Sequence, residues 1–128
     1  MTYYIATRVD GGMADAIART EEALQAEGFG VITRIDIAET LKKKIGADFR
    51  PYVILGACNP NLAHQALLLE DKVGTMLPCN VIVQQLDDGV EVAAIDPVAS
   101  MQAIDNPDLH KAAEEVRGML AAAIARLG

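Results

Sequence analysis

The stretch "CNVIVQQLDDGVEVAAID" (79–96) decides the fold, because it predicts a β-hairpin. Residues 79–86 and 90–96 are rich in valine, isoleucine and alanine, and "DDG" separates them. An Asp-Gly pair between two apolar runs is a strong signal for a short turn between antiparallel strands. The hairpin therefore favours an antiparallel arrangement for the rest of the sheet.

The residues before the hairpin predict three more strands that alternate with helices. Among them, "PYVILGAC" (51–58) is a near-continuous apolar run, which is typical of a central strand. A last helix begins near Asn106 and carries apolar residues three and four positions apart. The other expected elements are strands at 2–9 and 29–37, the latter with Phe29, Val31, Thr33 and Ile35 on one side, helices at 13–27, 38–46 and 60–72, and a short segment around 98–104.

These elements predict one α+β domain over residues 1–128. We expect a largely antiparallel sheet of about five strands with helices packed on one face. Apolar residues make up 52% of the chain and aromatic residues only 4%, so the core must consist mainly of Ala, Val, Ile and Leu. The apolar share is slightly above that of typical domains, which points weakly to a self-association surface.

Composition also narrows the function classes. The net charge of −7 argues against nucleic acids and anionic membrane surfaces as partners, because both require a basic face. The first residues lack the pattern of a signal peptide, and no apolar run is long enough to span a bilayer. With only two cysteines, we expect free thiols and a cytoplasmic location.

Three helix starts share one sequence device, an Asx-Pro pair that begins at Asn59, Asp96 and Asn106. The Asx side chain can accept hydrogen bonds from the first free amides, and proline lacks an amide that would have no partner. Helix capping is therefore a sufficient explanation for Asn59.

The two cysteines stand in similar segments, "GACNP" (56–60) and "LPCNV" (77–81). If strands 51–58 and 79–86 are parallel neighbours, Cys58 and Cys79 lie more than roughly 20 Å apart. If the strands are antiparallel, the two thiols meet at one end of the sheet. Chain length permits both topologies, and the hairpin favours the antiparallel one.

Cys58 would end a strand just before a helix N-terminus, where the helix dipole favours a thiolate. The alternative is that Cys58 is simply a small buried core residue. Asn80 is unusual because asparagine is depleted in strands and the "VIV" that follows looks buried. A buried amide needs hydrogen-bond partners, so Asn80 is expected either to hold a neighbouring loop or to line a polar pocket.

Other candidate chemistry is sparse. His64 would lie one turn into the helix after Cys58, so that His64, Cys58 and Cys79 are weak candidates for metal ligands, although no usual zinc spacing is present. Lysines 42–44 fall in the last turn of helix 38–46, where cations favour the helix dipole. A phosphate site at these lysines is the less economical interpretation.

The segment "DIAETLKKKIGADFRPYVILGACNPNLAHQALLLEDKVGTMLPCNVIV" (36–83) closely resembles the core of the domain of unknown function 302 family. The hairpin, "IDP" (95–97) and the terminal helix extend the likeness over almost the whole chain. The resemblance implies an α+β fold like that of the TATA-box-binding protein, commonly seen as a homodimer. It implies no established activity, and the cofactor stays unknown.

Three functional hypotheses follow. The first is a homodimeric binding module that holds a small ligand, an anion or a metal at Cys58, Asn59, Cys79 and Asn80. The second is a thiol-dependent enzyme or sulfur carrier, with Cys58 as nucleophile and Cys79 as resolving thiol. The third is a structural or partner-binding domain in which the cysteines only pack. The balance is against catalysis.

Overall fold

The computed structural model describes residues 2–128. Its elements follow the order that the sequence predicts. They are β1 (Tyr4–Val9), α1 (Met13–Ala26), β2 (Gly30–Asp36), α2 (Ile37–Ile45), β3 (Tyr52–Cys58), α3 (Pro60–Leu69), the 3-10 helix η1 (Asp71–Met76), β4 (Cys79–Leu86), β5 (Gly89–Ile95), α4 (Pro97–Ser100) and α5 (Pro107–Ala125).

The five strands form one antiparallel sheet in the order β1-β5-β4-β3-β2. The predicted hairpin is β4 and β5, and β4 is the middle strand. β3 pairs with β4 in the antiparallel direction, so the preferred topology for strands 51–58 and 79–86 is confirmed. The predicted fold class, a five-stranded antiparallel sheet with helices in one α+β domain, is confirmed as well.

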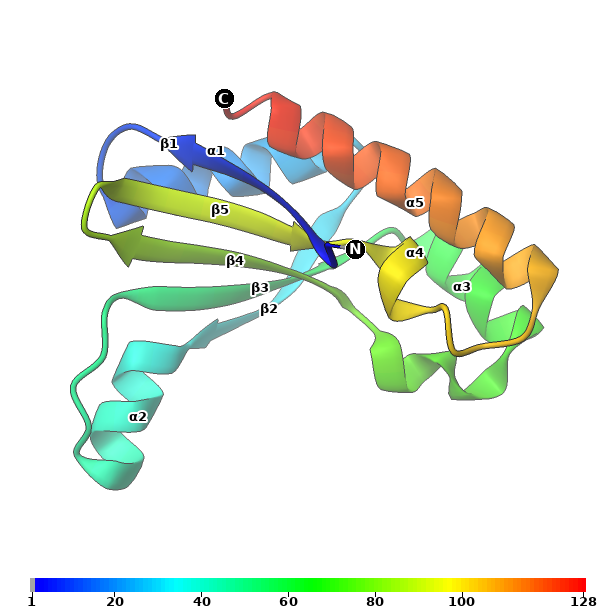
Figure 1. Ribbon diagram of the computed structural model, residues 1–128, viewed down its shortest axis with the longest axis horizontal. Helices are drawn as coiled ribbons and strands as arrows, with labels where there is room; N and C mark the ends of the chain where they lie inside the picture. Colours follow the sequence, from blue (N-terminus) through cyan, green and yellow to red (C-terminus); the bar gives the residue numbers. More distant parts are fainter. Residues whose placement is uncertain (1) are drawn as a thin grey trace.

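Helices α1 and α5 cover one face of the sheet (Figure 1). Between them lies the main core, where Leu24 of α1 and Leu120 of α5 are fully buried against inward-facing strand residues such as Leu55, Val81 and Val92. Helix α2 projects on the side of the sheet away from α1 and α5 (Figure 1). Within the described part of the chain, none of the helices has the length and apolar run needed to span a bilayer.

A second, smaller core joins α3, η1, α4 and α5 at one end of the sheet. Val73 of η1 and Leu109 of α5 are fully buried there, next to Ala66, Met101 and Ala113. The two cores meet where β3 ends and β4 begins. This junction is where the candidate site lies.

The three Asx residues cap helices as predicted. Asn59 Oδ1 accepts a hydrogen bond from the Leu62 amide at 3.1 Å. Asp96 and Asn106 likewise accept from the amides two and three residues further on. Asp36 caps α2 by the same means, a start that the sequence pattern did not single out.

Two local predictions were wrong. The helix expected over 60–72 ends at Leu69, because Glu70 is extended and begins the separate 3-10 helix η1. In β2, a register shift between Val31 and Thr33 interrupts the alternation of the strand. A bulge of this kind moves the following residues to the other face, so Val31 packs against the core while Thr33 and Ile35 are exposed.

Candidate functional site

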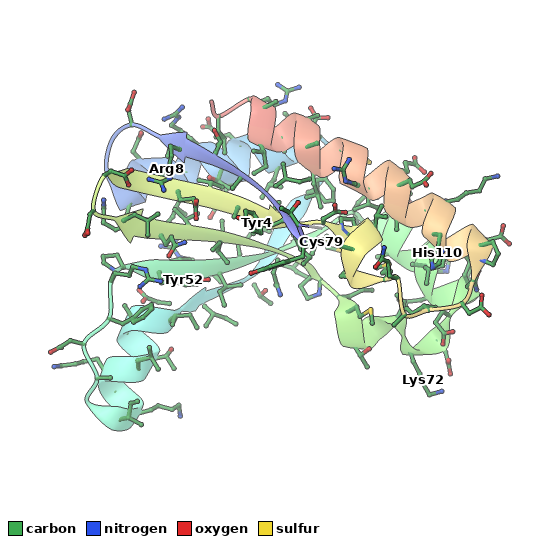
Figure 2. The ribbon with its side chains drawn as sticks, viewed as in Figure 1. Tyr4, Arg8, Tyr52, Lys72, Cys79 and His110 are labelled. Carbon is green, nitrogen blue, oxygen red and sulfur yellow. The ribbon has the colours of Figure 1, made fainter. Side chains whose placement is uncertain are left out.

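The antiparallel pairing of β3 and β4 brings the two cysteines to the same end of the sheet. Ala57 lies directly opposite Cys79, and Cys58 is the next residue along β3. Figure 2 shows Cys79 at this end, where the strands give way to the helices of the smaller core. Both thiols are free, with Cys58 partly exposed and Cys79 buried. The predicted meeting of the two thiols at one sheet end is therefore confirmed.

Cys58 and Cys79 line a cavity of about 300 Å³ between the sheet end and the smaller core. The walls are apolar: Phe29 and Ala57 come from the sheet side, Leu62 from α3, and Val116 from α5. Among the lining residues that the structure describes, none carries a charge, and the only polar side chains are the two thiols and the Asn59 amide. The cavity is suited to an apolar molecule.

Burial determines the protonation of the deeper thiol. Removal from water raises the pKa of Cys79 from 9.0 to about 11, and the nearby Cys58 adds a smaller increase. Burial disfavours the charged form of an acid, and a second thiolate close by disfavours it further. Cys79 is therefore a neutral thiol at physiological pH, and its neutral S–H group presents a weak hydrogen-bond donor to the cavity.

Asn59 lines the cavity and also caps helix α3. Its side-chain oxygen is occupied by the Leu62 amide, and its nitrogen lies against Gly28. A methyl group at Gly28 would lie 3.1 Å from Asn59 Nδ2, and Gly28 has a φ of +90°. The turn after α1 thus leaves room for the Asn59 side chain.

Asn80 lies on the opposite face of the sheet from the cysteine cavity. Successive strand residues point to opposite faces, so Cys79 faces the cavity while Asn80 is exposed on the side that α1 and α5 leave uncovered. There it borders a shallow hollow together with Tyr4 and Tyr52. The expectation of a buried Asn80 amide was wrong, because the flanking Val81 and Val83 are buried on the other face only.

His64 does not join the thiols. It is exposed on α3 and does not line the cavity. Among residues 2–128, no three His, Cys, Asp or Glu side chains come together in a group that could hold a metal ion.

The lysines of α2 partly neutralise nearby acids, since Lys42 pairs with Asp48 and Lys43 with Glu39, both at 2.8 Å.

Sequence reasoning missed the contribution of α5 to the cavity. Ala112, Ala113 and Val116 of α5 form one wall, whereas the sequence pattern indicated only an amphipathic stripe that packs on a core. The signal that could have revealed this is the pair of alanines within the stripe, since small side chains leave space between packed elements. Pro78, which precedes Cys79, also borders the cavity.

Comparison with known proteins identifies the family. The family model described as "Domain of unknown function DUF302" matches residues 5–127. The crystal structure of an uncharacterized conserved protein DUF302 from Bacillus stearothermophilus is 33% identical in sequence, with a TM-score of 0.94 over 100% of each chain. No curated protein matches the chain. The model match over almost the whole length shows that the chain belongs to the DUF302 family.

Proposed function

We propose that the chain is a small-molecule binding module whose cavity beside Cys58 and Cys79 holds a neutral, largely apolar ligand. The observation that carries the proposal is the lining, which combines apolar side chains with two thiols and one amide and, over residues 2–128, has no charged residue. Ligand pockets are typically apolar with a few polar groups that fix the orientation of the ligand. The cavity of the chain has this composition.

The volume limits the size of the ligand. About 300 Å³ is at the lower end of the range for small-molecule sites. If each non-hydrogen atom takes roughly the 30 Å³ of a water molecule, the cavity holds about ten such atoms. Ile32 and Leu67 lie at the cavity and are 63% and 43% exposed, so a longer apolar ligand can continue outward over them.

Charge supports a neutral ligand over an anion. A buried anion without a partner is costly, and the described part of the chain offers no cation in the lining. The helix α3 also gives little help, because Pro60 has no amide and the Leu62 amide is already bonded to Asn59. An anionic group on the ligand would therefore have to remain in water at the mouth of the cavity.

The thiol-enzyme alternative has less support. A resolving thiol must form a thiolate to attack a disulfide, and the raised pKa of Cys79 keeps it protonated at neutral pH. In the binding proposal, the two sulfur atoms act as soft, polarisable groups at the polar end of an apolar cavity.

Naphthalene, a neutral fluorescent probe of a size that the cavity can hold, tests the proposal. We expect saturable binding that Ala63→Phe weakens at least about tenfold, because Ala63 lines the cavity and a phenyl ring fills space that the probe needs. Gln65→Phe, exposed on the same helix and outside the cavity, is the matched control and should bind as the wild type does. Absence of binding, or equal loss in both variants, would contradict the proposal.

A further inference from the structure

The two thiols of the cavity differ in their access to water. Cys58 is partly exposed, whereas Cys79 is only 9% exposed. Both line the same cavity, because the pairing of β3 with β4 sets Ala57 opposite Cys79 and Cys58 directly after it. A thiol acts as a nucleophile only after it loses its proton, and water reaches the Cys58 thiol to take that proton up. Cys58 is therefore the better placed nucleophile of the pair.

The buried thiol of Cys79 is a hydrogen-bond donor that faces the cavity. None of the side-chain hydrogen bonds formed within residues 2–128 involves this thiol, although it lies in the cavity wall. Burial raises its pKa to about 11, so it keeps its proton at neutral pH. Buried polar groups in native proteins normally have a partner. The S–H group of Cys79 is thus available to a ligand atom that accepts a hydrogen bond.

The lining of the cavity restricts the reactions that a Cys58 thiolate can undergo there. In a displacement, such as attack on an alkyl halide, an anion leaves. The lining residues that the structure describes carry no charge, so a buried leaving anion would be costly. Addition to a C=C bond conjugated with a carbonyl group releases no anion. The charge that develops on the carbonyl group is removed when a neighbouring S–H group gives up its proton. The cavity therefore favours addition over displacement.

From these observations we propose that Cys58 is a site of covalent modification by apolar α,β-unsaturated aldehydes and ketones that bind in the cavity. The inference rests on the proposed function, because the cavity must first hold the apolar chain of the electrophile against walls that include Leu62, Ala63 and Val116. Holding a reactant beside a nucleophile raises its effective concentration. The protein thereby selects apolar electrophiles over polar ones of equal intrinsic reactivity.

The addition neither oxidises nor reduces the protein. Cys58 gives its proton to water, and its sulfur atom forms a bond to the β-carbon of the ligand. The π electron pair of the C=C bond moves toward the α-carbon and the carbonyl oxygen, and the α-carbon takes the proton of Cys79, which acts as a general acid. Cys79 then recovers a proton from water. The product is a thioether with a saturated carbonyl chain, and no co-reactant is consumed.

The selectivity is tested with trans-2-nonenal, which has about as many non-hydrogen atoms as the cavity holds. Mass spectrometry with peptide mapping measures the rate of adduct formation at Cys58, and glutathione provides the intrinsic rate. Relative to glutathione, Cys58 should favour trans-2-nonenal over trans-2-butenal at least about tenfold, because each buried methylene group favours binding about fourfold. Nonanal, which lacks the double bond, should leave no stable adduct. Equal ratios for the two unsaturated aldehydes, or labelling of Cys79 before Cys58, would overturn the inference.

Variants of the wall and of the donor test the two parts of the site. Ala63→Phe should slow the reaction with trans-2-nonenal about tenfold and change that with trans-2-butenal little, because the ring fills space that the longer chain needs. Gln65→Phe, outside the cavity on the same helix, is the matched control and should react as the wild type does. Cys79→Ala should slow the reaction about fivefold, and Cys79→Ser, which keeps a donor, should restore it. An unchanged rate in Cys79→Ala would overturn the donor role of Cys79.

Naphthalene binding separates the outcome for this inference from the outcome for the proposed function. Cys58→Ser should form no adduct and should still bind naphthalene as the wild type does, because only the nucleophile is removed. Circular dichroism checks that each variant is folded. If the wild type binds naphthalene but shows no preference for trans-2-nonenal, the covalent site is overturned and the binding module stands. If naphthalene does not bind and the preference is absent as well, both are overturned.

Discussion

Arg117 on α5 donates a hydrogen bond of 2.9 Å to Asp96, the residue that directly follows β5. The other carboxylate oxygen of Asp96 accepts from the amides of Val98 and Ala99 at 2.9 and 3.4 Å. One nearly buried side chain thus joins the sheet, α4 and α5 beside the cysteine cavity. Arg117 is half exposed, so Asp96 contributes more to this junction than its partner does.

Asp96→Ala is expected to lower the free energy of unfolding by about 2–3 kcal/mol, because it removes a helix cap and leaves Arg117 unpaired. Arg117→Ala should cost about 1 kcal/mol, since water can replace a half-exposed guanidinium. Urea denaturation measures both. Asp105→Ala, at an exposed position, should change stability by less than about 0.5 kcal/mol. A larger loss in Arg117→Ala than in Asp96→Ala would contradict this order.

Gly56 on β3 packs closely under Thr33 and Pro78. A methyl group at this position would lie 2.7 Å from Pro78 Cγ and would overlap Thr33 Oγ1. We expect Gly56→Ala to destabilise the fold by about 1–3 kcal/mol, because the added methyl group would push against the rigid ring of Pro78 and would force the Thr33 side chain to move. Gly118→Ala, in α5 with open space around it, should instead stabilise by about 0.5–1 kcal/mol. Thermal unfolding compares the two, and equal effects of either sign would contradict the packing argument.

The elements that depend on local signals were predictable from the sequence. The Asp-Gly turn indicated the β4–β5 hairpin, and the Asx-Pro pairs indicated three helix starts, because a turn or a cap needs only a few neighbouring residues. These predictions rest on chemistry that is complete within a short segment. The meeting of Cys58 and Cys79 was favoured by the hairpin but not decided by it, because the chain length also permitted parallel strands.

It was harder to predict from the sequence which face of the sheet each strand residue lies on. The run after Asn80 looks buried on both sides, yet α1 and α5 cover only one face of the sheet, so Asn80 is exposed and the alternate residues that follow it in β4 are partly exposed. The bulge in β2 reverses the faces of Thr33 and Ile35 without a proline or glycine at the shift to mark it. The cavity itself forms between β2, β3, α3 and α5. Such a space depends on how distant segments pack, and no local pattern encodes it.

Because of Cys79, the free energy of unfolding is expected to fall as the pH becomes alkaline. Its pKa is about 11 in the folded chain against 9.0 for an ordinary thiol, so above about pH 9 the unfolded chain releases the proton first. Stability from the neutral thiol is full below pH 9 and is lost as the pH rises toward 11. Urea denaturation between pH 8 and 11 should show a steeper loss in the wild type than in Cys79→Ala. A matching slope in Cys79→Ala would mean that the thiol is not the titrating group.

The same shift predicts the reactivity of the thiol. In Cys58→Ser, iodoacetamide should label Cys79 slowly at neutral pH, because alkylation requires the thiolate. Its labelling should still rise at higher pH than that of an ordinary thiol, since burial, the larger cause of the shift, is retained. Mass spectrometry of the time course measures the rate. Rapid labelling at pH 7 would show that Cys79 is reactive and would favour the thiol-enzyme alternative.

Asn59 allows the capping role to be separated from a ligand contact. Asn59→Asp keeps the oxygen that accepts from Leu62, so its free energy of unfolding should stay within about 0.5 kcal/mol of the wild type, whereas Asn59→Ala should lose about 1 kcal/mol. Binding of the neutral probe should follow the reverse order. A carboxylate in an apolar wall must be desolvated when the probe enters, so Asn59→Asp should bind weakly and Asn59→Ala as well as the wild type. If Asn59→Ala also abolishes binding while it remains folded, the amide itself contacts the ligand, and the cavity recognises a polar group at the start of α3.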